Sequence, residues 1–281
     1  MTAHFPRGSV IRRVNIEPAI ALGAGRALVL QLARPEVAQG VADHSDFKRN
    51  PFSRLLGTLE ATYAVVFGSA DLAEGVGRRL RWIHSHVVGA GYSANDPTHL
   101  LWVHATLVDT ALRCYEDLVA TLPVADAETY YQEMRRVAEV FGVPAALQPK
   151  SLTAFRAWFD HELRRLEVTD TGRDLIGFVL DPELPLRLHR PLGPLLRAQR
   201  TFTLGSLPDP VRDQLEAPWG TAESAAFERL RRRARQTFQW LPAPVRTAPN
   251  VAVGPLLMHQ AARHVRAFDR RTLPVEGASA A

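Results

Sequence analysis

The chain has 281 residues, of which 46% are hydrophobic and 22% charged, so it can bury a sizeable core and is not a disordered protein. Its formal charge of +5 is carried almost entirely by arginine, because lysine occurs only as Lys48 and Lys150. The single cysteine, Cys114, excludes an internal disulfide and a thiolate metal cluster and fits a reducing compartment.

The N-terminal part of the chain lacks the apolar segment that a secretory signal requires. The most apolar stretch there, residues 19–33, is too short to span a bilayer and is interrupted by Arg26. We therefore expect a cytoplasmic protein without a transmembrane segment. The sequence assigns no role to Arg26.

Apolar residues at helical spacing predict the first elements of the chain. They indicate helices over residues 20–32, 50–67 and 71–89, the first of them ended by Pro35. His44 lies between the first two helices, where we expect it to cap a helix or to lie in a loop.

Two histidines with a possible chemical role lie on successive predicted helices. In the segment RRLRWIHSHVVG, Arg81 and His84 fall on one line of the helix and Ser85 adjoins it. The next predicted helix, residues 97–121, contains LLWVHATLVD, in which His104 takes a position that an aliphatic residue would fill. A buried imidazole needs a partner, which can be a backbone carbonyl or a metal ion.

The rest of the chain also favours helices. Helical spacing predicts them over residues 126–141, 151–166, 169–180, 192–202, 224–240 and 255–269. The run from Arg229 to Arg235 is interpreted as a solvated helix face, so we expect no specific binding of nucleic acid. The sequence predicts an all-α protein, with one globular domain over residues 1–271 and a flexible tail at 272–281.

Motifs for several other chemistries are absent from the sequence. It contains no HExxH, no GxSxG, no pair of Glu-x-x-His motifs and no phosphate-binding glycine loop after a strand. By contrast, His84 and His104 could lie on opposite sides of a planar group. Haem fits this arrangement, because it takes a neutral imidazole ligand in an apolar slot and its propionates pair with arginine.

Four segments of the sequence resemble one known family. They are GRALVLQLARPEVAQGVADHSDFKRNPFSRLLGTLEATYAVVFG, IHSHVVG, YSANDPTHLLWVHATLVDT and YYQEMRRVAEVFGVP. In this order and spacing they are similar to the bacterial family of latex clearing protein and MpaB, over most of residues 20–180. The resemblance implies a globin-like helical core and a haem b oxygenase.

The resemblance also implies roles for individual residues. His104 matches the proximal haem ligand of the family, and Arg81, His84 and Ser85 match a distal line that reads arginine, lysine and threonine in the rubber oxygenases. A histidine in place of that lysine leaves open whether His84 ligates iron, acts as an acid or base, or only lines the pocket. Arg34 replaces a histidine found in many relatives.

The implied activity is oxidation of a small apolar, unsaturated substrate by dioxygen, with electrons from a donor that the sequence does not identify. Two other classes remain open. If both His84 and His104 ligate iron, the protein is a haem-binding sensor or electron carrier without turnover. If His104 is a core histidine, the chain is a cofactor-free helical scaffold or a nucleic-acid binder.

Overall fold

The computed structural model describes residues 2–44, 51–182 and 186–272, with the side chains of all except 51–55 and 186–190. Helices account for most of these residues, and one two-stranded hairpin is the only sheet among them. The predicted all-α class is therefore confirmed. The predicted tail lies, apart from Thr272, outside the described residues.

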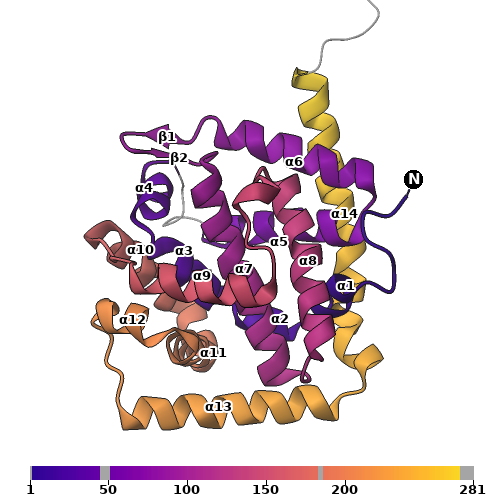
Figure 1. Cartoon of the computed structure of the whole chain (residues 1–281). Helices are drawn as coiled ribbons and strands as arrows, with labels where there is room; N and C mark the ends of the chain where they lie inside the picture. Colours follow the sequence, from indigo (N-terminus) through magenta and orange to yellow (C-terminus); the bar gives the residue numbers. More distant parts are fainter. Residues whose placement is uncertain (1, 45–50, 183–185, 273–281) are drawn as a thin grey trace, which may run out of the picture.

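The first half of the chain ends in the central helix of the fold. It comprises α1 Val10–Asn15, α2 Ala19–Leu22, α3 Ala24–Leu32, α4 Pro35–His44, α5 Pro51–Phe67, α6 Ala70–His84, β1 Val88–Gly89, β2 Tyr92–Ser93 and α7 Pro97–Leu118. Figure 1 shows α7 running through the middle of the molecule. Asp96 caps the start of this helix, because its side chain accepts a hydrogen bond from the backbone N–H of Thr98. Pro97 follows at the first helical position.

The second half surrounds that centre. It comprises α8 Val124–Val140, α9 Leu152–Arg164, α10 Asp170–Leu180, α11 Leu186–Ser206, α12 Asp209–Arg212, α13 Thr221–Trp240 and α14 Ala243–Thr272, with 3-10 turns at Ala145–Leu147 and Asp213–Leu215. α7 packs against α2, α3, α8 and α13, whereas α6 packs against α5, α8 and α14. Figure 1 shows α13 closing one end of the molecule and α14 one side.

Most predicted helices are present, with two corrections in the first half. The helix predicted over residues 20–32 is divided at Gly23, whose backbone approaches α7 so closely that a Cβ there would lie 2.4 Å from Thr110 Cγ2. The helix predicted over 71–89 ends at His84, and the residues after it form the hairpin. The turn between the two strands contains Gly91, which has a φ of +82°. The sequence did not predict α1, α4 or the hairpin.

The arginine run on α13 is only partly a solvated face. Arg229, Arg232 and Arg233 are exposed. Arg231 lies 3.4 Å from a carboxylate oxygen of Asp117, and Arg235 donates a hydrogen bond to the carbonyl of the same residue. Two of the five arginines in the run therefore attach α13 to the C-terminal end of α7. No helix in the described part of the chain has the length and apolarity needed to cross a bilayer.

Candidate functional site around His104

His104 lies in the middle of α7, and its side chain is almost completely buried, with 7% of the residue exposed. The backbone of Met134 on α8 lies close enough to the ring of His104 to influence its protonation. Nε2 is also buried but has no hydrogen-bond partner among the described residues. Nε2 is therefore the ring nitrogen that the described residues leave unused.

The protonation of His104 follows from its burial. Removal from water disfavours the charged imidazole and lowers the pKa of His104 to about 4, although the contact with the Met134 backbone acts in the opposite direction. The ring is therefore neutral at pH 7. A neutral imidazole has a lone pair on one ring nitrogen, and this is the form of histidine that binds a metal.

This environment discriminates between the two roles considered for His104. An unpaired polar atom in the core costs about 1–3 kcal/mol, so a histidine present only for packing is expected to have both nitrogens paired. A metal-binding histidine commonly donates its second N–H to a backbone carbonyl, which fixes the ring. The surroundings of His104 match this second pattern. Among the described residues, no three His, Cys, Asp or Glu side chains are grouped as metal ligands.

Arg81 lies beside the end of α8. Its Nη1 donates a hydrogen bond of 2.6 Å to the carbonyl of Val140, and Asn95 in turn donates to the carbonyl of Arg81. A Cβ built on Gly142 would lie 3.4 Å from Arg81 Cδ and 3.6 Å from Leu100 Cδ1. Since Leu100 is one turn before His104 on α7, the stem of Arg81 reaches the same face of that helix.

α8 is the element that connects the two candidate residues. Its Met134 backbone contacts the ring of His104, and its Val140 carbonyl accepts from Arg81. At 1.5 Å per residue these two positions are about 9 Å apart along the helix axis. The helices α6 and α7 make few direct contacts, so α8 sets the relative position of Arg81 and His104.

His84 and Ser85 form the C-terminal end of α6. His84 is half-buried, whereas Ser85 is exposed and donates a hydrogen bond of 2.6 Å to the carbonyl of Trp82. The structure therefore directs the hydroxyl of Ser85 toward its own helix. His44, the last residue of α4, contacts the carbonyl of Val88 in the hairpin through Nε2 at 3.1 Å, in agreement with its predicted position at a helix end.

Three groups of hydrogen bonds hold α3 against α7. Trp102 donates to the carbonyl of Leu30, and Gln31 donates to Thr106. The third group centres on Arg26, which is 1% exposed. These contacts lie on both sides of His104 in the sequence, so they fix the helix that carries it.

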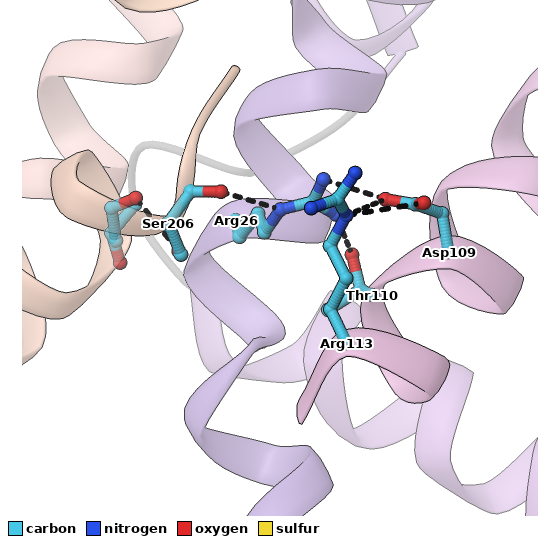
Figure 2. Close-up of polar contacts among 6 residues, drawn as sticks. Arg26, Asp109, Thr110, Arg113 and Ser206 are labelled. Carbon is cyan, nitrogen blue, oxygen red and sulfur yellow. Dashed lines mark hydrogen bonds and ion pairs between the residues drawn. The ribbon is translucent and has the colours of Figure 1, made fainter. Parts of the chain in front are cut away.

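Figure 2 shows that every nitrogen of the Arg26 guanidinium has a partner. Nη2 lies 2.6 Å from a carboxylate oxygen of Asp109, Nη1 donates to Thr110, and Nε donates to the carbonyl of Ser206. Arg113 also donates to Asp109. Arg26 is therefore a structural clamp that joins α3, α7 and α11. In the sequence, this pair is indicated only by a charged residue within each of two apolar helices.

Arg34 has a structural environment of its own. Its guanidinium lies 6.0 Å from the ring centroid of Trp102, and it is 3.5 Å from Glu36 and 3.4 Å from Glu162. It connects the start of α4 with α7 and α9.

Comparison with known proteins finds relatives of this chain. The uncharacterized protein Mb2261 of Mycobacterium bovis is 29% identical over 219 residues, which cover 72% of this chain and 82% of that protein. The uncharacterized protein Rv2237 of Mycobacterium tuberculosis gives the same values. No solved structure matches the chain. The model of the family "ER-bound oxygenase mpaB/B'/Rubber oxygenase, catalytic domain" matches residues 11–236, and the protein therefore belongs to this oxygenase family.

Proposed function

We propose that the protein is a haem b-dependent oxygenase that oxidises a small apolar, unsaturated molecule, and that His104 is the axial ligand of the haem iron. The buried, unpartnered Nε2 of His104 carries this proposal. The pKa of about 4 keeps this nitrogen unprotonated throughout the physiological range. A single neutral imidazole in an apolar interior is what haem requires from the protein.

Each residue of the site has a defined task in this proposal. Haem b, when bound, supplies the iron at which dioxygen is activated. His104 would hold the cofactor through Nε2, and its contact with the backbone of Met134 would keep the ring oriented. Arg81 and His84 would provide hydrogen-bond donors to the bound groups, and Arg81 could instead pair with a propionate. Ser85 would contribute only after its hydroxyl leaves the carbonyl of Trp82.

The surrounding helices supply the apolar environment of the reaction. Leu100, Leu101 and Ala105 of α7 are buried around His104. Such side chains exclude water, which strengthens the hydrogen bonds made by Arg81 and His84 and favours an apolar substrate. The family to which the chain belongs supports oxygenase chemistry.

The haem content of purified protein tests the proposal. The experiment compares the absorption spectrum and pyridine haemochrome of the wild type with those of His104→Ala and His86→Ala, after expression with haem supplied. His86 is the matched control because it is an exposed histidine two residues from His84. We expect haem in the wild type and in His86→Ala and its loss in His104→Ala. Equal haem content in all three proteins would remove His104 from the ligand role.

Carbon monoxide distinguishes an oxygenase from a haem protein with two histidine ligands. The reduced wild type is expected to shift its absorption spectrum on exposure to the gas, because one side of the iron is open in an oxygenase. If His84 is a second ligand, His84→Ala should bind carbon monoxide and the wild type should not. That result would favour a sensor or electron carrier.

A further inference from the structure

The outer face of α14 is apolar over its first half. Residues Val245, Val251, Val253 and Leu256 have exposed fractions of 59%, 58%, 46% and 69%. Ala243, Pro244, Ala248, Pro249, Ala252 and Pro255 are also exposed and complete this surface, which we call the α14 apolar face. Trp240, at the end of the preceding helix, is 83% exposed. Soluble proteins rarely leave so continuous an apolar surface in water.

The α14 apolar face is not the result of a helix that fails to pack. Gly254, Ala261 and Val265 are buried on the opposite side. Near its start, Arg246 makes two hydrogen bonds to the carboxylate of Glu17, at 2.6 and 2.7 Å. This ion pair ties α14 to the segment between α1 and α2, and α14 also packs against α5 and α6, so the residues that it exposes are held outward.

The second half of the same face is basic. At 100° per residue, Arg263, Arg266 and Arg270 continue the line of Val245 and Leu256 along the helix, and all three arginines are exposed. Asp269 is the only acidic residue between positions 243 and 272, and it pairs with Arg78 of α6 on the inner side. The outer face therefore has an apolar half and a half in which the charged side chains are all arginines.

We propose that the α14 apolar face and the three arginines form a docking surface for a bilayer that contains anionic phospholipids. An interfacial helix places apolar side chains at the boundary of the acyl chains and cationic side chains on the phosphates. Tryptophan is favoured at membrane interfaces, and the exposed Trp240 precedes α14 by three residues in the sequence. The binding is peripheral, since α14 remains packed on the protein.

A second copy of the chain fits this surface less well. Two α14 helices packed in parallel would bring their arginines together, and two packed antiparallel would cover the arginines of each with the apolar half of the other. Both arrangements bury positive charge without a counterion. The surface lies beyond residues 11–236, which match the family, and the proposal does not depend on the proposed function.

Vesicle co-sedimentation of the full chain tests this docking surface. The vesicles are phosphatidylcholine alone or phosphatidylcholine with phosphatidylglycerol, and the wild type is expected to bind the second kind. Leu256→Glu should weaken binding about tenfold or more. Arg263→Gln and Arg266→Gln should each weaken binding to the anionic vesicles about fivefold. Leu195→Glu is the matched control, because Leu195 on α11 is 65% exposed, and it should bind like the wild type.

Three results would overturn the proposal. The first is a wild type that stays in the supernatant with both kinds of vesicle. The second is an equal loss of binding in Leu195→Glu and Leu256→Glu, which would show that the surface is elsewhere. The third is self-association, measured by sedimentation velocity without lipid, that Leu256→Glu abolishes; this would assign the surface to a second copy of the chain.

Discussion

The free energy of the folded protein without a ligand contains an unfavourable contribution from His104. Its Nε2 is buried without a partner, and an unpaired polar atom of this kind costs about 1–3 kcal/mol. Burial also excludes the charged ring, so the folded protein holds its imidazole neutral at pH values where the unfolded chain protonates it. A side chain with these two costs is expected where a ligand compensates for them.

Replacement of His104 by leucine should reveal both costs in the haem-free protein. At pH 7.5, His104→Leu should be at least as stable as the wild type, because the unpaired nitrogen is removed. The folded pKa of about 4 lies below the unfolded value of 6.5, so the unfolded chain binds the additional proton between these values. The wild type should therefore lose on the order of 3 kcal/mol relative to the variant as the pH falls through this window.

Urea unfolding of both proteins at several pH values between 7.5 and 4.5 measures these differences. A His104→Leu protein that is destabilised by more than about 1 kcal/mol at pH 7.5 would mean that the ring contributes more by packing than its free nitrogen costs. Parallel pH profiles would contradict the lowered pKa.

The helices α3 and α7 are joined by charge as well as by apolar contacts. Arg26 and Asp109 are both buried and lie 83 residues apart in the sequence. Loss of one member of such a pair leaves an uncompensated charge in the core, which is more costly than the loss of an exposed ion pair. The clamp therefore fixes α7 on the side of His104 nearest the C-terminal end of the helix.

Arg26→Met should destabilise the protein by about 3–5 kcal/mol, because Asp109 loses its buried partner and Thr110 and the Ser206 carbonyl lose a donor. Arg113→Met is the matched control, since Arg113 binds the same carboxylate with a side chain that is 55% exposed, and it should cost less than about 1 kcal/mol. Urea unfolding at pH 7 compares the two variants. Equal costs would show that the buried pair does not stabilise the contact between α3 and α7.

Hydrophobic spacing predicted α5, α7, α8, α9 and α10 to within a few residues, because one face of each helix is buried. Proline accounts for several of the differences. Pro35 was interpreted as a stop, and α3 does end before it, at Leu32, but Pro35 is also the first residue of α4, where its missing N–H costs nothing. Pro249 and Pro255 lie inside α14, which begins at Ala243 rather than at residue 255. The start of α14 depends on contacts with the distant Glu17, which no local pattern contains.

At the candidate site, too, one residue could be predicted from the sequence and its contacts could not. His104 could be singled out from the sequence because a polar side chain interrupts an apolar helix face. Its contact with Met134 and the bond from Arg81 to Val140 join separate helices. Neither backbone carbonyl leaves a mark in the sequence, so these two contacts could not be predicted.

At the scale of the whole molecule, α14 supports the helix that carries Arg81 and His84. It packs along α5 and α6, and a Cβ built on Gly75 of α6 would lie 2.5 Å from Cγ1 of Val265. The two helices meet so closely only because α6 has no side chain at this point. Val265 lies beyond the end of the family match at residue 236, so α14 extends the packed core rather than forming a separate appendage.

A double-mutant cycle tests the closeness of this contact. Gly75→Ala should destabilise the protein by about 1–3 kcal/mol because its methyl group overlaps Val265, and Val265→Ala alone should cost about 2 kcal/mol through the lost methyl groups. With Val265 shortened, the nearest remaining atom is its Cβ, at 3.6 Å. The double variant should therefore lose less stability than the sum of the two single losses, by at least about 1 kcal/mol.

Gly177→Ala on α10 is the control for the intrinsic preference of a helix for alanine, because no described atom lies within 4 Å of the added methyl group. This variant should gain up to about 1 kcal/mol. Thermal and urea unfolding measure all four variants. Additive costs at Gly75 and Val265 would mean that α6 and α14 do not touch in solution, and that the helix with Arg81 and His84 is held by α5 and α8 alone.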